Sequence, residues 1–527
     1  MIGKGYFPFD LTNIFYKGYL PAIELWKNIP NNEYTKLIAE FTTKIWDFKA
    51  ESTKYCKLDC KCLHEVLIKI NELIFNNFNI NIHVSLTLPA LATRIYNSQF
   101  MPENTIYQLL GNVEKDIRES YTGGAVDVYI PHNRINNVLD SFKAYFTKIY
   151  WYDANSLYPF VMANTSMPVG KPIAFEGDIR KIDPSAFGFF YCKINSPEFI
   201  KHPILQRRIK TPNGIRTIAG LGSWTGWIYS AEMENAMRFG YTFDILKGYE
   251  FQKGNLFKDY VNKMYNLRME YEKGHPMNLI AKLLMNSLYG KFGMRLESTA
   301  IEIFDISNET EADILSDMLE VYGKSVKDIV RLDNNVVTVR DTLLHYEYNE
   351  NEDMFHGLNV NIAIASSVTA GARMWMSTIK NNPNFNLYYS DTDSAVVDRP
   401  LPSYMVGGAL GQFKLEYVVK RAVFLAPKVY GLKAEDGSEI IKIKGVSNDI
   451  LPNIHIEDLE NLLIQDSKRE FIQEKMYKKI VEGEITIQDI AYTLKVTSNK
   501  REAIYVDGIF NSTKPYYYDE IINNDIS

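Results

Sequence analysis

The sequence predicts a mixed α/β (α+β) fold divided into several domains. Two aromatic, β-branched segments, 145–153 and 386–397, predict strands that present aspartates at their ends. The segments 55–78 and 255–292 predict helices from the spacing of their apolar residues, and the Ala/Ser-rich segment 360–376 predicts a third. With 527 residues the chain is too long for one core, and we expect roughly three or four domains.

The composition is that of a folded protein. Apolar residues make up 46% and aromatic residues 13%, which is ample for packed cores and excludes a disordered chain. The net charge of -6 argues only weakly against nucleic-acid binding, because an acidic surface elsewhere can mask a basic groove in the sum. No apolar run is long enough to span a bilayer, and the first ten residues resemble neither a secretion signal nor a presequence. We therefore expect a soluble protein with no membrane partner.

The first hundred residues are expected to be helical with irregular connections. Three cysteines lie close together there, Cys56, Cys60 and Cys62, and His64 follows them. Their spacing does not match the paired Cys-x-x-Cys ligand sets of structural zinc sites, and no second ligand pair follows. We interpret them as small buried side chains on a helix rather than as a zinc site.

The rest of the chain alternates between regular and broken segments. Residues 168–228 are rich in Gly and Pro and predict an inserted subdomain. Within 255–292, residues 274–276 (Gly-His-Pro) predict a turn between two helices. The acidic stretch 297–355 predicts a second insertion. The last eighty or so residues are expected to be helical and then irregular.

Three separated segments carry residues suited to chemistry. The first is Asp153-Ala-Asn-Ser-Leu-Tyr158-Pro159, in which a carboxylate at a strand end precedes a tight turn that leaves backbone carbonyls free. Hard oxygen ligands of this kind suit Mg²⁺. Taken alone, however, the segment is more often an ordinary turn capped by an aspartate.

The second segment, Tyr389-Ser-Asp391-Thr-Asp393-Ser394, predicts the tip of a hairpin between buried strands. Two carboxylates at such a tip repel one another, and a cation would relieve that cost. A solvent-facing Asp-rich turn is the alternative. It fits poorly, because the segment contains neither Gly nor the Asn-Gly and Asp-Gly pairs typical of hairpins.

The third segment is a predicted helix on which Lys282, Asn286 and Tyr289 share one face. These side chains could meet a triphosphate, a sugar and a base. A solvated polar stripe is the alternative, but Tyr289 followed by Gly290 is unusual on a surface helix. Acidic residues on strands opposite a basic helix are what two-metal phosphoryl transfer requires.

At these residues the sequence resembles the family B DNA polymerases, specifically the protein-primed branch found in small bacteriophages, adenoviruses and linear mitochondrial plasmids. The segments around Asp153, Lys282 and Asp391 are similar in order and spacing to the family's motifs A, B and C. Two shorter stretches resemble its YxGG and KxY motifs, namely Tyr121-Thr-Gly123-Gly124 and Lys428-Val-Tyr430.

The resemblance implies a DNA-directed DNA polymerase that uses two Mg²⁺ ions, with Mn²⁺ as a substitute. The implied metal ligands are Asp153, Asp393, Asp391 and the carbonyl of Ala154. Tyr158 would sit under the deoxyribose and exclude a 2′-hydroxyl. The other implied nucleotide contacts are Lys282, Asn286, Tyr289 and Arg268, and the implied DNA contacts are Tyr121, Gly123, Gly124, Lys428 and Tyr430.

The resemblance also implies a right-hand polymerase with palm, fingers and thumb, plus a partial ribonuclease H-like exonuclease domain. Insertions after motifs A and B would accommodate a terminal-protein primer and encircle the DNA. The implied domains are an exonuclease remnant (1–118), the palm (119–163 and 359–446), two insertions (164–254 and 295–358), the fingers (255–294), and the thumb with a C-terminal tail (447–527).

The expected exonuclease is incomplete. Tyr55 and Asp59, one helical turn apart, resemble the third exonuclease motif of the family. The Asp-x-Glu of the first motif and the Asn-to-Asp stretch of the second are missing upstream of Tyr55. We therefore expect an N-terminally truncated enzyme that does not proofread.

Two other functions stay open. A reverse transcriptase also uses metal-binding carboxylates for phosphoryl transfer. It typically carries two adjacent acidic residues, however, whereas Asp391 and Asp393 are separated by a threonine. A truncated, non-catalytic DNA-binding relic is the second, although the intact polymerase residues argue against it.

The expected partners of a monomeric enzyme are primer-template DNA, deoxynucleoside triphosphates and a terminal protein. A bias toward Lys, Asn, Ile and Tyr, together with the plasmid resemblance, favours a mitochondrial protein, with a viral or bacteriophage protein in the host cytoplasm as the alternative.

Overall fold

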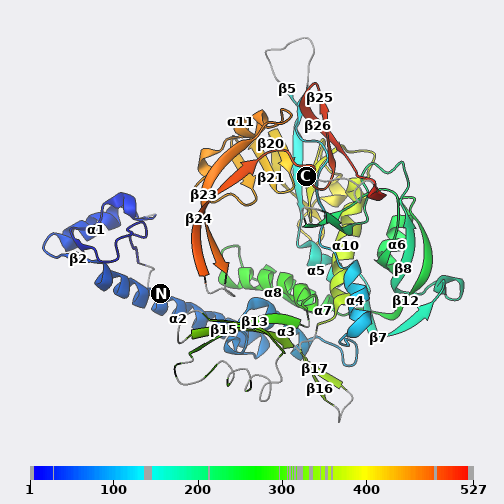
Figure 1. The fold of residues 1–527 in the computed structure, drawn as a ribbon, viewed down its shortest axis with the longest axis horizontal. Helices are drawn as coiled ribbons and strands as arrows, with labels where there is room; N and C mark the ends of the chain where they lie inside the picture. The colour runs from blue at the N-terminus through cyan, green and yellow to red at the C-terminus, as the bar shows by residue number, and fades with distance from the viewer. Residues whose placement is uncertain are drawn as a thin grey trace. The chain divides into compact units, whose positions relative to one another are not determined.

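The computed structural model describes residues 5–519, except 28, 136–144, 212–213, 296, 480–483 and several short stretches between 306 and 359. The chain divides into two compact units (Figure 1). The first consists of Met1–Ile95 and Leu267–Ala281, and the second of Tyr96–Asn266 and Lys282–Ser527. Helices and strands are mixed along the chain, which confirms the predicted α/β class. None of the helices in the described part combines the length and apolar character that a membrane span needs.

The first unit is largely helical, as predicted. Its longest helix, α2 (Phe48–Phe78), begins where the Asp47 side chain accepts a hydrogen bond from the Ala50 amide at 3.2 Å. It ends at Asn79 in the left-handed conformation, so the helix predicted at 55–78 is confirmed. The other elements of residues 5–99 are α1 (Asn31–Phe41), α3 (Leu88–Gln99), the 3-10 turns η1 (Ile23–Leu25) and η2 (Ile82–Val84), and the paired strands β1 (Lys17–Gly18) and β2 (Trp46–Asp47).

The three clustered cysteines lie on α2, but their predicted burial is wrong. Cys56 and Cys60 are exposed and Cys62 is half-buried. The buried residues of this long helix are Ile74 and Phe78, near its C-terminal end. The apolar periodicity therefore predicted the helix correctly, but it did not predict which of the helix's side chains are buried.

A seven-stranded antiparallel sheet lies at the centre of the second unit, in the order β22-β21-β20-β6-β19-β18-β3. The strand predicted at 145–153 is confirmed as β6, although its first residues pair separately as β5 with β4. The hairpin predicted at 386–397 is confirmed as β18 and β19. The bounds are β3 (Val126–Val128), β4 (Arg134–Ile135), β5 (Tyr145–Phe146), β6 (Ile149–Ala154), β18 (Leu387–Asp391), β19 (Ser394–Val397), β20 (Phe413–Ala426), β21 (Val429–Ala434) and β22 (Glu439–Ile443).

Two helices of the second unit are central to its packing. On one side, α11 (Ile456–Asn461) packs against β20 and β21 and completes a core of buried aliphatic and aromatic side chains. The helix α10 (Ile362–Lys380), which confirms the prediction at 360–376, is buried over most of its length. It starts where the Asn361 side chain accepts hydrogen bonds from the amides of Ala363 and Ile364. It packs against α4 (Gly111–Ser120) and α5 (Leu157–Asn164) (Figure 1).

The Gly- and Pro-rich region 168–228 is built mainly of strands. A four-stranded sheet in the order β11-β8-β12-β7 buries one face in a core of its own, which includes Phe190, Ile194 and Trp224. The glycines and prolines of this region are divided between the connections and the strands themselves, where Gly170, Pro172 and Gly188 lie. The elements are β7 (Met167–Glu176), β8 (Gly188–Asn195), β9 (Arg207–Thr211), β10 (Gly214–Ile218), β11 (Ser223–Tyr229), α6 (Ser230–Met237), β12 (Thr242–Gly254) and η3 (Ile179–Lys181).

Two helices separated by a turn follow, as predicted for 255–292. They are α7 (Lys258–Met269) and α8 (Pro276–Phe292), and Gly274 between them has a φ of 99°. The stretch after α8 contains strands β13 (Glu297–Asp305), β14 (Ser325–Arg331), β15 (Val336–Leu344), β16 (Tyr346–Asn349) and β17 (Met354–Gly357). Much of the segment predicted as an acidic insertion, 297–355, lies outside the described residues.

The prediction that the final eighty residues are helical and then irregular is wrong. After α11 the chain forms two hairpins, one of β23 (Arg469–Lys479) and β24 (Glu484–Leu494), the other of β25 (Glu502–Val506) and β26 (Ile509–Lys514). Glu, Lys and Gln in 469–494 favour helix locally, but pairing with a partner strand overrides that preference. Hydrogen bonds between Gln473 and the 445–447 backbone fix the first hairpin to the end of the sheet.

Candidate active site

The two aspartates ranked first from the sequence lie on neighbouring strands. Asp153 is on β6 directly opposite Ser394 of β19, in antiparallel register. The turn between β18 and β19 consists of Thr392 and Asp393, and Thr392 has a φ of 56°. The amide of Ala154 donates to the carbonyl of Asp393 at 2.8 Å. The sheet register therefore holds Asp153 and Asp393 together although 240 residues separate them in the chain.

Both carboxyl groups are held where negative charge is disfavoured. Burial, followed by the charges of Asp153 and Asp391, raises the pKa of Asp393 to about 7. Burial and the nearby Glu416 raise the pKa of Asp153, while Lys414 and Lys282 act in the opposite direction. The repulsion predicted from the sequence is thus a property of the folded site.

Asp391 is held differently from the other two. Its carboxylate accepts hydrogen bonds from Nζ of Lys428 at 2.7 and 3.0 Å, which joins motif C to the KxY segment. Lys428 has a φ of 63°, and its amide donates to the hydroxyl of Tyr389 at 3.0 Å. Tyr430 packs beneath this pair, against the rings of Trp151 and Tyr389.

The residues fit a divalent cation in kind. Two repelling carboxylates with a third one nearby are hard oxygen ligands, which Mg²⁺ prefers. Within the described part of the chain, no three His, Cys, Asp or Glu side chains are already gathered around one point. Asp391 is engaged in the ion pair with Lys428, and the charge of Asp153 is close enough to raise the pKa of Asp393.

The predicted nucleotide-facing residues lie on α8 and α5. Lys282 is close enough to Asp153 to lower the pKa of that carboxyl. The rings of Tyr158 and Tyr289 lie 4.3 Å apart between centroids. The amide of Asn286 donates to the carbonyl of Lys282 at 2.7 Å within the same helix. Motifs A and B are therefore in direct contact through two tyrosines.

Three predicted residues belong to the first unit, and their roles stay predictions. Arg268 lies near the end of α7, where its carbonyl accepts a hydrogen bond from Asn278 at 2.9 Å. Tyr55 and Asp59 lie on α2, as the proposed third exonuclease motif requires. The ring of Tyr55 packs against Phe7 and Phe9, at centroid distances of 5.4 and 5.6 Å.

The YxGG segment packs against the turn that contains Asp393. A Cβ on Gly124 would lie 2.6 Å from Cγ2 of Thr392, so only glycine fits there without a shift. The amide of Thr392 donates to the carbonyl of Ala125 at 2.9 Å. Tyr121 lies close to Gly293, whose added Cβ would be 2.9 Å from its hydroxyl.

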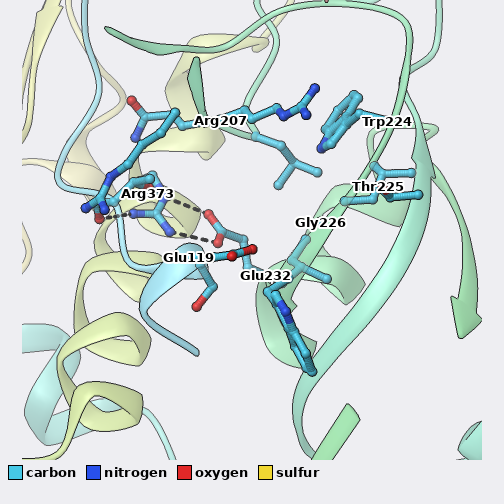
Figure 2. A pocket seen from close by; sticks show the side chains of 15 residues that line it. Glu119, Arg207, Trp224, Thr225, Gly226, Glu232 and Arg373 are labelled. Carbon is cyan, nitrogen blue, oxygen red and sulfur yellow. Dashed lines mark hydrogen bonds and ion pairs between the residues drawn. The ribbon is translucent and has the colours of Figure 1, made fainter. Parts of the chain in front are cut away.

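Sequence reasoning missed the residues that hold the YxGG segment. Arg373 on α10 and Glu232 on α6 form a buried ion pair beside it. A pocket of about 270 Å³ adjoins the pair and is lined also by Arg207, Trp224 and Thr225 (Figure 2). The one available signal was Arg373 itself, a charged residue in an Ala/Ser-rich helix. Glu232, 141 positions away, carried none.

Comparison with known proteins places this geometry in a family. Residues 1–384 match the family described as DNA polymerase type B, organellar and viral. The chain belongs to this family. The match ends just before motif C, but similarity to individual members of the family continues beyond it.

Three fungal relatives illustrate that similarity. Proteins named probable DNA polymerase from Ascobolus immersus and Podospora anserina are 32% and 30% identical over 99% and 98% of this chain. A third, from Neurospora intermedia, is 32% identical over 87% of it. The chain spans less than half the length of each, between 42% and 45%.

The fold resembles that of a solved polymerase. Phi29 DNA polymerase complexed with primer-template DNA superposes with a TM-score of 0.58 and 21% identity, over 84% of this chain and 72% of that one. Its ternary complex with incoming nucleotide substrates gives a TM-score of 0.59 and 20% identity. At this identity the likeness establishes the shared fold.

Proposed function

We propose that this chain is a DNA-directed DNA polymerase that extends a 3′ hydroxyl by two-metal phosphoryl transfer. The observation that carries the proposal is the pair Asp153 and Asp393, held side by side by the β6–β19 register, with the pKa of Asp393 raised to about 7. Lys282 lies within electrostatic reach of Asp153. Membership of a family of DNA polymerases supports the same activity.

Each residue has a role in this proposal. Asp153, Asp393 and the carbonyl of Ala154 would hold Mg²⁺, and Asp391, which is paired with Lys428 in this structure, would be a further ligand. Bound divalent ions would supply positive charge that stabilises the reacting oxygens. Lys282 neutralises charge on the triphosphate, while Asn286 faces the nucleotide beside it.

Other side chains orient the substrates. Tyr158, held against Tyr289, forms the surface under the deoxyribose, where its ring would meet a 2′-hydroxyl. Tyr121, Gly123, Gly124, Lys428 and Tyr430 contact the primer-template, and Arg268 is a second triphosphate contact. Apart from that of Arg268, these roles match the family motifs residue by residue, and the contacts among the motif residues in the second unit support the arrangement.

The proposal extends to the domains and to the biological setting. The region around Asp153 is the palm, α7 and α8 are the fingers, and the hairpin β23–β24 belongs to the thumb. The regions 164–254 and 295–358 are the two insertions, and they accommodate a terminal-protein primer. We further propose a monomer that replicates a linear element, in mitochondria or in a virus-infected cell, as the organellar and viral family description suggests.

Primer extension tests the central proposal. We expect the wild-type chain to extend a primed DNA template with Mg²⁺, and Asp393→Asn to lose at least roughly a hundredfold in kcat, because charge stabilisation at the reacting oxygens is removed. Primer-template affinity, measured by fluorescence anisotropy, should be largely unchanged, since DNA backbone contacts come from other residues.

The matched control is Asp507→Asn, an exposed turn aspartate with a φ of 50°, which Asn also tolerates. Activity of Asp393→Asn within a few-fold of wild type would contradict the metal assignment. DNA binding without any incorporation by the wild type would instead identify a non-catalytic relic. Preferential use of an RNA template would point to a reverse transcriptase.

A further inference from the structure

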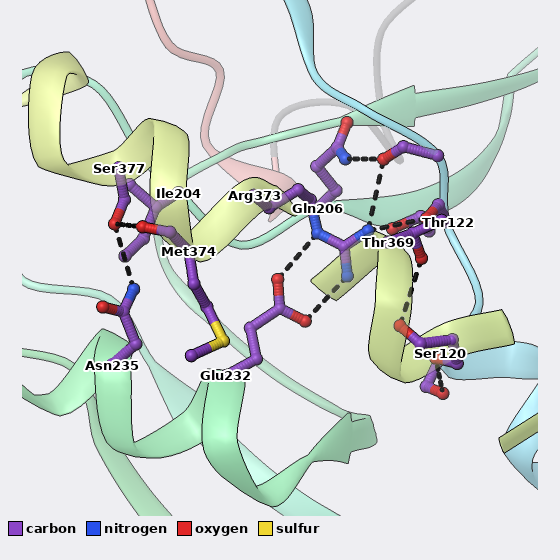
Figure 3. A network of polar contacts seen from close by, with 12 residues as sticks. Ser120, Thr122, Ile204, Gln206, Glu232, Asn235, Thr369, Arg373, Met374 and Ser377 are labelled. Carbon is purple, nitrogen blue, oxygen red and sulfur yellow. Dashed lines mark hydrogen bonds and ion pairs between the residues drawn. The ribbon is translucent and has the colours of Figure 1, made fainter. Parts of the chain in front are cut away.

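The guanidinium of Arg373 joins three parts of the second unit. Nε and Nη2 donate to the two carboxylate oxygens of Glu232 at 2.7 and 2.8 Å. Nη1 donates to the carbonyl of Thr122 at 2.6 Å and to that of Gly123 at 3.2 Å. Figure 3 shows the Arg373 side chain between the Glu232 carboxylate and Thr122. The side chain is 4% exposed, so little of this network meets water.

Only arginine can make this set of contacts. Its planar fork presents donors in fixed directions, whereas a lysine ammonium is a single point of charge on a flexible stem. A buried ion pair contributes little net stability compared with apolar packing of the same volume. What the pair does contribute is geometry, because two successive carbonyls of the YxGG segment must point toward Nη1.

A fixed YxGG segment in turn fixes the metal-binding turn. Gly124 is in contact with Thr392, and the carbonyl of Ala125 accepts the amide hydrogen of Thr392. Immediately afterwards, Val126 of β3 pairs with Asp391 of β18. A displacement of the Thr122–Gly123 peptide would therefore pass, over two or three residues, to the turn that bears Asp391 and Asp393.

The inserted region 164–254 supplies the side chains that bind Arg373 and the YxGG carbonyls. Glu232 lies on α6, between β11 and β12, and Gln206 from the same region donates to the carbonyl of Gly123 at 2.8 Å. Arg208 donates to the carbonyl of Tyr121. The carbonyls of Tyr121, Thr122 and Gly123 thus all accept hydrogen bonds from side chains outside the motif.

We propose that Arg373, oriented by Glu232, is a positioning residue that sets the YxGG segment and, through it, the carboxylates of motif C. The insertion 164–254 is therefore a structural support of the active site, in addition to any role in priming. This inference rests on the proposed polymerase function, because the benefit of the contact is metal and DNA binding at that site.

The variant Arg373→Lys tests the inference with three measurements. Mn²⁺ affinity of the metal-free protein is followed by electron paramagnetic resonance, primer-template affinity by anisotropy, and kcat and KM by primer extension. We expect Mn²⁺ and DNA affinity to fall and kcat to drop by roughly ten- to a hundredfold, as misplacement of reacting groups by up to ~1 Å would cause. The KM for nucleotide should change little, because Lys282 and Asn286 are on another helix.

A second, more exposed arginine–glutamate pair, whose glutamate also lies on α6, provides the control. Arg180 donates to Glu234 of α6 at 2.5 Å, but this pair does not touch the YxGG segment. Arg180→Lys should leave all three measurements at wild-type values. If Arg373→Lys does not fold, Glu232→Gln replaces it. This variant keeps an oxygen acceptor for Nε, and a smaller loss in the same direction is expected.

Two results separate this inference from the proposed function. Mn²⁺ and primer-template affinities that stay within about twofold of wild type in a folded Arg373→Lys or Glu232→Gln variant would overturn the positioning role, because about 0.4 kcal/mol is too small for a lost support. Failure of the wild type to incorporate nucleotides would overturn the proposed function. The Mn²⁺ measurement needs no turnover, so it still decides the role of Arg373.

Discussion

Asp393 lies in surroundings that disfavour its own negative charge. It is half-buried, and this burial, together with the charges of Asp153 and Asp391, raises its pKa to about 7. A carboxyl group ordinarily titrates near 3.8. The folded protein therefore binds a proton at Asp393 more tightly than the unfolded chain does, and this difference links folding to pH.

The sign of that linkage gives a prediction in the absence of metal. Because the folded-state pKa is raised, the free energy of unfolding should fall as pH rises from about 4 to about 7, and stay lower above that range. Asp393→Asn removes the repulsion, so at pH 8 in EDTA it should stabilise the protein by on the order of 1–3 kcal/mol. At pH 4 the two proteins should be nearly equal.

Urea unfolding at pH 4 and pH 8 measures this difference. Excess Mg²⁺ should reverse it at pH 8, since the wild type gains a ligand and the variant loses one. Equal stabilities of wild type and variant at pH 8 in EDTA would show that Asp391 and Asp153 do not act on Asp393 as described.

At the scale of elements, the two-residue turn between β18 and β19 depends on the segment behind it. Thr392 has a positive φ, and its side chain occupies the space that a Cβ on Gly124 would need. Both strands flanking the turn lie in the central sheet, so the turn cannot move away freely. Substitution at Gly124 must therefore displace the turn itself.

Gly124→Ala should reduce incorporation and Mg²⁺ affinity together. The added methyl group would cost about 1–3 kcal/mol as overpacking, and it would shift Asp393. The double variant Gly124→Ala/Thr392→Gly should recover much of the loss, because glycine at 392 frees the space and accepts the positive φ. Steady-state primer extension over a range of Mg²⁺ concentrations measures both effects.

Gly408→Ala is the control for that pair, because a Cβ on Gly408 would meet no atom within 4 Å. If the Gly124→Ala loss persists unchanged in the double variant, contact with Thr392 is not its cause.

Elements with strong local patterns were predictable, and those fixed by distant partners were not. The α2 helix, the α7–turn–α8 pair and the β18–β19 hairpin follow from periodicity and turn residues. The β23–β24 hairpin does not, because its Glu-, Lys- and Gln-rich strands are stabilised by each other and by Gln473 contacts with 445–447. The exposure of Cys56 and Cys60 also depends on what packs around α2.

At the scale of the whole molecule, the first unit bears the residues assigned to proofreading. Tyr55 and Asp59 lie on α2, and the strands described between residues 5 and 95 are the two-residue β1 and β2. Tyr55 is engaged in ring contacts with Phe7 and Phe9. Among the residues that the structure describes, no three acidic, His or Cys side chains gather around Asp59, and a lone carboxylate is a poor site for two-metal hydrolysis.

We therefore expect this chain not to degrade a mismatched 3′ end. The measurement is the shortening of a labelled primer with a terminal mismatch, in Mg²⁺ and without nucleotides. Asp59→Ala should leave the background unchanged, and Asp393→Asn serves as a control for any reversal of polymerisation. Degradation by the wild type that Asp59→Ala abolishes would contradict the expectation.

The sequence by itself determined which side chains could do chemistry. Asp153, Asp391, Asp393 and Lys282 were recognisable because carboxylates at strand ends and a lysine on a helix are suited to metal and phosphate, and their order matched a family. The tertiary structure decided how they meet: the β6–β19 register pairs Asp153 with the motif C turn, and Lys428 engages Asp391. It also decided that Arg373 and Glu232 support the YxGG segment. Long-range pairing leaves no local pattern, because the interacting residues lie in segments whose own preferences are unaffected by the contact.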